Sequence, residues 1–161
     1  IYGAAAARRV IFAGFGVGIV CSLIGSQIML EGDGYSYAAV AFRVAIASAT
    51  AFLAAQLLDV AVFNRLRDGS WWRAPLVSTL IGSTIDSVIF FTIAFAASLT
   101  FLEPSSDVSW AAVSGPLLGS GPMVPLWVSL AVADWGVKFG IAVFGLLPFR
   151  LIIAKFSIRV A

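Results

Sequence analysis

"YAAVAFRVAIASATAFLAAQLLDVAVF", residues 37–63, runs for 27 residues and contains only two charged side chains, those of Arg43 and Asp59. A helix that crosses a membrane needs about 20 mostly apolar residues to cover about 30 Å of hydrocarbon. A transmembrane β-strand needs only about ten residues, in which apolar and polar side chains alternate. This stretch is too long for such a strand and does not alternate. It therefore predicts a membrane-spanning helix.

The rest of the chain has the same character. Three more stretches are long and apolar enough to span, at about residues 10–30, 75–101 and 124–147, and the last is expected to end at Pro148. Charged residues make up 11% of the 161-residue chain, whereas a soluble domain has about a quarter. We predict an all-α fold, a polytopic transmembrane helix bundle with four spans, forming a single transmembrane domain over residues 1–161.

Charged residues outside the spans are segregated by sign. Acidic residues, without lysine or arginine, occupy the loop after the first span and the loop after the third. Basic residues dominate the start, the loop between the second and third spans, and the tail. Because cytoplasmic segments of membrane proteins are enriched in lysine and arginine, both ends of this chain are expected to be cytoplasmic. The net charge of +2 then reflects membrane orientation, and we expect no nucleic-acid partner. The basic residues are Arg8, Arg9, Arg65, Arg67, Arg73, Arg150, Lys155 and Arg159, and the acidic loop residues are Glu31, Asp33, Glu103 and Asp107.

Five charged residues lie inside the predicted spans: Arg43, Asp59, Asp86, Asp134 and Lys138. Placing such a side chain at the bilayer centre costs about 3 kcal/mol on insertion scales, unless the charge is paired or faces water. All five are therefore expected to face the bundle interior. Alternatively, Arg43 reaches out to the headgroups, and Asp59 pairs with arginines at the inner end of its span.

The two charges of the fourth span are four residues apart, so Asp134 and Lys138 lie one helical turn from each other. One interpretation is that they neutralise each other and only dock the span in the bundle. Against it, replacing a buried ion pair by apolar residues is often neutral or stabilising, which favours a functional role. Asp86 has no basic residue within one turn. Its partner must come from another helix or from a ligand.

Uncharged residues near these charges predict the kind of ligand. Gln56 shares a helix face with Asp59, and Phe90 lies one turn beyond Asp86. A cavity lined by carboxylates, an amide, cations and aromatic rings suits a planar, hydrogen-bonding molecule such as a nucleobase. Alternatively, the aromatic residues serve only helix packing.

The chain contains no histidine, which removes serine–histidine catalysis and histidine metal sites. We expect no enzyme activity, no catalytic residue, no metal site and no cofactor. Gly14 and Gly18, and likewise Gly136 and Gly140, have the spacing of small residues at close helix contacts. We predict close helix packing at both pairs.

The stretch "FRVAIASATAFLAAQLLDVAVFNRLRDGSWWRAPLVSTLIGSTIDSVIFFTIAF", residues 42–95, resembles the queuosine precursor transporter family, a branch of the vitamin-uptake transporters. "IYGAAAARRVIFA" at the start and "ADWGVKFG" near the end are similar to that family as well. The resemblance implies a bacterial inner-membrane importer of 7-deazaguanine precursors, such as 7-cyano-7-deazaguanine. It also implies six membrane helices, so that two helices would precede the four in this chain.

The resemblance also implies roles for the residues in the spans. A carboxylate of Asp86 or Asp134 would accept hydrogen bonds from a guanine-like N1–H and amino group. Arg43 and Gln56 would bind the carbonyl or nitrile side, and Lys138 would set the charge of Asp134. The substrate-binding residues expected in total are Arg43, Gln56, Asp59, Asp86, Phe90, Asp134 and Lys138.

The expected partners are a purine-like substrate and the lipid bilayer. The family is similar in helix arrangement to the substrate-binding subunits of energy-coupling-factor transporters, so a homo-oligomer and an energising partner both stay open. An alternative function is a membrane assembly subunit, in which the charged residues of the spans pair only with a partner helix.

Overall fold

The computed structural model describes residues 3–32 and 34–157, and within them four long helices make up the body of the molecule. They are α1 (Gly3–Gln27), α2 (Phe42–Leu66), α3 (Arg73–Phe95) and α4 (Leu126–Ser157). All four are long and apolar enough to cross a membrane. The predicted all-α, polytopic fold is confirmed.

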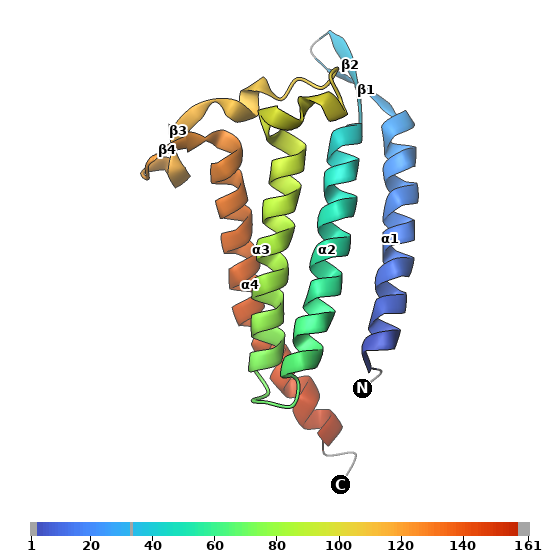
Figure 1. Cartoon of the computed structure of the whole chain (residues 1–161), viewed down its shortest axis with the longest axis vertical. Helices are drawn as coiled ribbons and strands as arrows, with labels where there is room; N and C mark the ends of the chain where they lie inside the picture. Colours follow the sequence, from blue (N-terminus) through green and yellow to red (C-terminus); the bar gives the residue numbers. More distant parts are fainter. Residues whose placement is uncertain (1–2, 33, 158–161) are drawn as a thin grey trace.

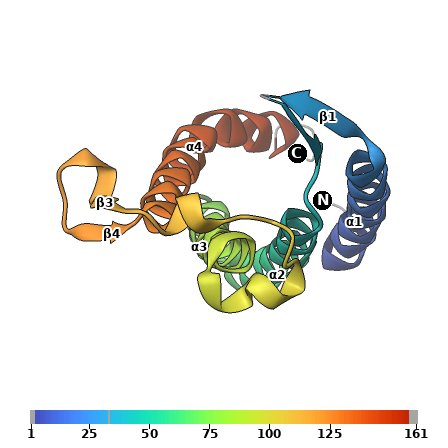
Figure 2. The ribbon, with the colours of Figure 1, turned by 90° about the horizontal axis from the view of Figure 1, so that it is seen from above.

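The helices form a row in chain order, in which α2 packs on α1, α3 on α2 and α4 on α3. Seen from above, the row is curved, with α1 and α4 at its two ends (Figure 2). Neighbouring helices run in opposite directions, so α1 begins and α4 ends at the same end of the bundle as the loop between α2 and α3 (Figure 1). The central helices α2 and α3 therefore have neighbours on both sides.

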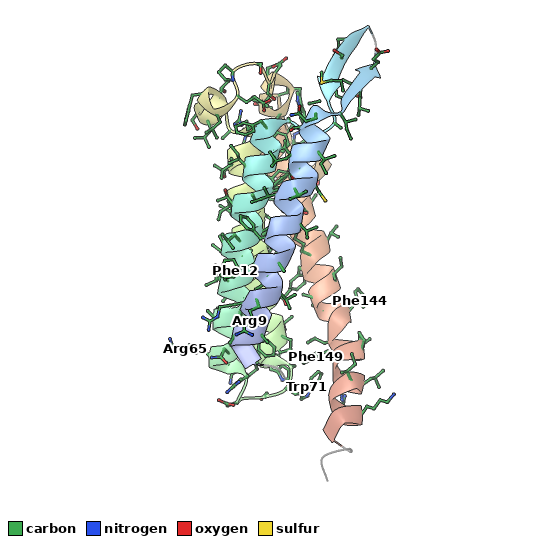
Figure 3. The ribbon with its side chains drawn as sticks, turned by 90° about the vertical axis from the view of Figure 1, so that its right-hand side faces the viewer. Arg9, Phe12, Arg65, Trp71, Phe144 and Phe149 are labelled. Atoms are coloured by element: carbon green, nitrogen blue, oxygen red, sulfur yellow. The ribbon has the colours of Figure 1, made fainter. Side chains whose placement is uncertain are left out.

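Charge separates the two ends of the bundle. Arg9, Arg65 and Trp71 lie together at the end that carries the α2–α3 loop (Figure 3). We call this the basic end and the opposite one the hairpin end, where the acidic residues Glu31 and Glu103 lie in the segments that connect the helices. Of the charged residues considered above, Asp33 and Arg159 lie outside the described residues.

Helix α4 is longer than its predicted span. Pro148 lies inside it, and the helix continues to Ser157, so the prediction that the span ends at Pro148 is wrong. A proline removes one backbone hydrogen bond, but ending the helix in an apolar environment would leave several more groups unpaired. The guanidinium of Arg150 also lies 5.5 Å from the ring centre of Trp71, a cation–π contact that holds the last turns of α4 to the α2–α3 loop.

At the hairpin end, residues expected to be the ends of spans form other structures. Strands β1 (Met29–Gly32) and β2 (Tyr35–Ala38) pair antiparallel, with Glu31 opposite Ser36. Gly34, at φ +87°, makes the tight turn between them, a conformation that glycine adopts without steric cost. Residues 28–30 and 37–41 are thus outside the helices, because the polar turn between them closes a hairpin.

The connection from α3 to α4 is made of short elements. Three 3₁₀ turns, η1 (Ala97–Leu102), η2 (Ser109–Ala112) and η3 (Leu117–Gly119), follow the end of α3. Strands β3 (Ser114–Pro116) and β4 (Met123–Pro125) form a second antiparallel hairpin around η3. The predicted third span therefore ends at Phe95 instead of at about residue 101.

The tightest helix contact joins α2 to α3 through rows of small side chains. On each helix the buried small residues recur every fourth position, so they form one ridge. A methyl group added at Gly82 would lie 3.4 Å from the carbonyl oxygen of Ala55, so the backbones approach closely here. Small residues allow such approach in membranes. The two rows are Ala47, Ala51 and Ala55 on α2 and Ala74, Ser78 and Gly82 on α3.

The predicted glycine contacts are not formed. A methyl group added at Gly18, Gly136 or Gly140 would meet no atom within 4 Å, and one added at Gly14 would meet only the Phe52 ring, at 3.8 Å. The prediction of close packing at these pairs is wrong for the described part of the chain. Spacing alone does not say which side of a helix faces a neighbour, and here Gly136 and Gly140 of α4 face open space.

Candidate functional site

A cluster of charged groups joins α3 to α4 within the helical part of the bundle. Nζ of Lys138 donates to Oδ2 of Asp86 at 2.6 Å and to Oδ2 of Asp134 at 2.5 Å. The predicted pairing of Asp134 with Lys138 is confirmed, and Asp86 receives its basic partner from another helix, as expected. One ammonium group thus bridges two carboxylates on different helices.

Ser87 completes this cluster. Its hydroxyl donates to Oδ2 of Asp134 at 2.6 Å and lies 3.4 Å from Nζ of Lys138. Ser87 is buried, whereas the side chains of Asp86, Asp134 and Lys138 are each about one-third exposed, at 30%, 33% and 31%. The charged groups are therefore held from one side and accessible from the other.

A second polar contact fixes the depth of α4 relative to α3. The indole Nε1–H of Trp135 donates to the hydroxyl of Thr84 at 2.9 Å, and that hydroxyl donates to the carbonyl of Leu80 at 2.8 Å. Because Trp135 follows Asp134 directly, this contact also sets the height at which the carboxylate of Asp134 meets α3.

A polar cavity of about 340 Å³ lies beside the cluster, between α2, α3 and α4. This volume is within the usual range for small-molecule sites, about 300–1,000 Å³. It brings together four residues that the sequence places on three separate spans: Gln56, Asp59, Asp86 and Lys138. Asp134 touches this group through Lys138. The full lining is Phe52, Ala55, Gln56, Asp59, Thr79, Gly82, Ser83, Asp86 and Lys138.

Arg43 lies elsewhere, at the hairpin end. It is fully buried, and its Nε and Nη2 donate to the carbonyls of Ile93 and Ala96 at 2.6 and 2.5 Å. These carbonyls end α3, where they have no partner within the helix. The backbone N–H of Arg43 donates to the carboxylate of Glu103 at 2.8 Å. Arg43 therefore neither lines the cavity nor reaches out to the headgroups.

Phe90 also lies outside the cavity lining. Its ring contacts Phe91 edge-on, with centres 5.1 Å apart, and Phe95 at 6.2 Å. Phe95 in turn contacts Trp110 at 5.4 Å. These rings form an aromatic cluster that packs the η2 turn onto the end of α3, which is the packing alternative considered for this residue.

Asp59 occupies an unusual position in the cavity wall. Its Oδ1 is buried and has no hydrogen-bond partner within the described residues. The same side chain borders a second cavity, of about 510 Å³, between the first turns of α1 and the last turns of α2. The alternative pairing of Asp59 with an arginine is not formed, since Arg67 lies against Asp68.

Two participants were not expected from the sequence. Glu103 is expected there only as a loop charge, and Ser87 is not singled out there. Both act on a residue far away along the chain, Glu103 on Arg43 and Ser87 on Asp134. No local pattern marks such contacts. Within the described residues, no three histidine, cysteine or acidic side chains gather to hold a metal ion.

Comparison with known proteins identifies the family of this chain. The sequence model of the family described as "Putative vitamin uptake transporter" matches residues 1–153. The chain belongs to this family. The queuosine precursor transporter of Escherichia coli (strain K12) is 34% identical over 155 residues, which cover 92% of this chain and 61% of that protein. The "Probable queuosine precursor transporter" of Haemophilus influenzae is 38% identical over 118 residues, which cover 69% of this chain and 49% of that protein.

This chain spans between about half and three-fifths of the lengths of these two relatives. No solved structure matches the chain. The family and the four apolar helices together identify a multi-pass membrane protein. The resemblance to queuosine precursor transporters expected from residues 42–95 is confirmed.

Proposed function

We propose that this protein imports a queuosine precursor, 7-cyano-7-deazaguanine or a related 7-deazaguanine, across the bacterial inner membrane. The observation that carries the proposal is the polar cavity in which Gln56, Asp59, Asp86 and Lys138 meet between three apolar helices. Charged groups inside spans are costly and mark transport pathways. The names of the two relatives support the choice of substrate.

The cavity offers the groups that a guanine-like base requires. Asp86 can accept hydrogen bonds from the ring N1–H and the neighbouring amino group, as a carboxylate has acceptor sites for both. Gln56 can donate to a carbonyl or nitrile and accept from an N–H group. Phe52 supplies an apolar ring beside these polar groups. Between the two carboxylates first considered, the position in the lining favours Asp86 as the direct contact.

The other expected site residues would act indirectly. Asp134 holds Lys138 at the cavity edge, and Ser87 holds Asp134. Arg43 and Phe90 tie the hairpin end of α3 to α2 and to the η2 turn. In the proposed transport cycle the midplane site opens alternately to the two sides of the membrane, and these contacts at the hairpin end would change when the site opens there.

The proposed orientation puts the basic end in the cytoplasm, and with it both ends of this chain. Arg9 and Arg65 lie at that end (Figure 3) and Lys155 lies in the last turn of α4, while Glu31, Glu103 and Asp107 lie in the connecting segments of the hairpin end. The positive-inside rule supports this assignment. The chemistry proposed is transport without covalent change of the substrate, so the protein would not be an enzyme.

One observation favours the alternative of a membrane assembly subunit. Gln56 is exposed, and the charged cluster is about one-third exposed, although polar groups in a membrane should be covered by protein or face a water-filled cavity. A partner helix, from another copy or from an energising subunit, could cover them. In that case the charged residues would serve association instead of substrate binding.

Uptake of labelled 7-cyano-7-deazaguanine into cells that cannot synthesise it tests the proposal. Cells that express the protein in its full natural length should accumulate label. Asp86→Asn and Asp134→Asn should each reduce uptake by about tenfold or more, because a lost hydrogen bond to a charged group costs about 1.5–3 kcal/mol. The control is Asp68→Asn, because the side chain of Asp68 is 92% exposed in the α2–α3 loop. This variant should transport normally.

Two other results would decide against importing. No accumulation by the unchanged protein, when it is present in the membrane, would show that the substrate is wrong. Loss of a partner or of an oligomer in Asp86→Asn and Asp134→Asn, with uptake per assembled complex unchanged, would favour the assembly subunit.

A further inference from the structure

Asp59 separates two cavities that otherwise share no lining residue. On one side is the proposed substrate cavity with Gln56, Asp86 and Lys138. On the other is the larger cavity toward the basic end, between Ala6 and Val10 of α1 and Phe63 and Arg67 of α2. Among the described residues, Asp59 is the only one that belongs to both linings. It therefore lies between the proposed substrate cavity and the cavity toward the basic end.

The charge of Asp59 is the one in this region that lacks compensation. Lys138 contacts both Asp86 and Asp134, but no salt bridge formed by the described residues includes Asp59. Its Oδ1 is buried without a donor. A carboxylate oxygen in this position loses its hydration and gains nothing in exchange.

The groups around Asp59 indicate what could compensate it. Among the described residues, the α1 wall presents small apolar side chains such as Ala6, Ala7 and Val10, and no titratable group. From α2, Asn64 and Arg67 line the second cavity. On the other side, the ionisable groups in the described lining are Asp86 of α3 and Lys138 of α4. A calcium ion would need six to eight oxygen ligands, far more than gather here. A proton needs only the carboxylate itself.

We propose that Asp59 carries a proton between the two cavities and thereby couples import to proton flow into the cell. A hydronium ion in the substrate cavity transfers its proton to Asp59, which leaves water and a neutral carboxylic acid. The acid then transfers the proton to water in the second cavity, which regenerates the carboxylate and a hydronium ion. Asp59 gains one proton and loses one in each transport cycle. Its release of the proton accompanies the inward opening of the substrate cavity, so one proton enters the cell with each substrate molecule and the inward proton gradient drives import. This inference rests on the proposed function.

The neutral acid also explains why Asp59 can sit against α1. A carboxylic acid can be buried against alanine side chains at far lower cost than a carboxylate, because it carries no net charge. On the opposite side α3 lies close to Asp59, since a methyl group added at Gly82 would lie 3.5 Å from Cβ of Asp59 and 3.8 Å from its Oδ1.

Vesicles containing the purified protein in its full natural length provide the test. Labelled 7-cyano-7-deazaguanine is supplied outside, with a pH gradient (acidic outside) imposed or absent, and a pH-sensitive dye reports on the vesicle interior. For the unchanged protein we expect the gradient to raise accumulation about tenfold, and uptake to acidify the interior. For Asp59→Asn the ratio of accumulation with and without the gradient should fall to about one, whatever its basal rate. Asp59→Glu should keep a ratio well above one, and Asp68→Asn should match the unchanged protein.

The outcomes separate this inference from the proposed function. If the unchanged protein does not exchange labelled for unlabelled substrate even without a gradient, the proposed function fails. If it exchanges substrate but neither responds to the gradient nor acidifies the interior, the proton inference fails and the proposed function stands. A gradient ratio in Asp59→Asn equal to that of the unchanged protein would also overturn the role of Asp59. Should Asp59→Asn not transport or not fold, Asp59→Glu decides, because a proton carrier must retain coupling with the longer acid.

Discussion

Lys138 is the residue on which the charged cluster depends. Its ammonium group has two carboxylate partners, Asp86 at the cavity and Asp134 on its own helix, and a third contact with Ser87. If a ligand binds the carboxylate of Asp86, Lys138 still has its contacts with Asp134 and Ser87. The positive charge therefore stays paired with and without ligand, so the exchange of Asp86 between lysine and ligand does not leave an isolated charge in the bundle.

Neutral substitutions distinguish a structural cluster from a functional one. Lys138→Met alone should lower the free energy of unfolding by about 3–5 kcal/mol, because it leaves two carboxylates without a cation. The triple variant Asp86→Asn, Asp134→Asn, Lys138→Met should recover most of that loss, since no charge remains uncompensated, yet take up no substrate. Unfolding in detergent and uptake in cells measure the two effects. A triple variant as unstable as Lys138→Met would mean that the charges serve stability.

At the scale of elements, the contact between α2 and α3 supports the whole site. The rows of Ala47, Ala51 and Ala55 and their partners on α3 let the two backbones approach closely. This contact brings Gln56 and Asp59 of α2 to the same height as Ser83 and Asp86 of α3. The small side chains beside the cavity allow the tight contact between α2 and α3, and the larger polar side chains next to this contact line the cavity.

A larger side chain in this contact should separate the helices. Ala51 is 1% exposed, and Ala51→Leu should lower the free energy of unfolding by about 1–3 kcal/mol through overpacking. The matched control is Ala61→Leu, because Ala61 lies on the same helix but is exposed. Thermal unfolding of both variants in detergent measures the difference. Equal stability of the two would show that α2 and α3 do not pack through the alanine row.

At the scale of the whole molecule, the distribution of charge over the helix ends predicts the orientation of the protein in the membrane. The four helices alternate in direction (Figure 1), and basic residues such as Arg9 and Arg65 lie at one end of the bundle (Figure 3). The proposed substrate cavity lies along the middle helices, and the second cavity lies toward the basic end. With the basic end in the cytoplasm, as proposed from the positive-inside rule, the order of the cavities would match the proposed direction of import.

Labelling of single cysteines tests this orientation. In a Cys21→Ala background, Ser36→Cys in the β1–β2 hairpin should react with a membrane-impermeant thiol reagent added to spheroplasts, whose inner membranes are intact. Asp68→Cys in the α2–α3 loop should react only after the membrane is permeabilised. Both positions are exposed, so accessibility depends only on the side of the membrane. The reverse labelling pattern would place the basic end outside.

The sequence alone determined the number of long helices, their class and the segregation of charge between the two ends. In lipid each helix must pair its own backbone groups, so the length of an apolar run is enough to predict a span. It also singled out Gln56, Asp59, Asp86, Asp134 and Lys138 by the cost of polar groups in a membrane. Only the tertiary structure decided which of these meet. Three features depend on the rotation and relative height of neighbouring helices: the bridge from Lys138 to Asp86, the position of Arg43 at the end of α3, and the continuation of α4 through Pro148. Rotation and height follow from side-chain packing between segments far apart in the chain, and the length of an apolar run contains no information about them.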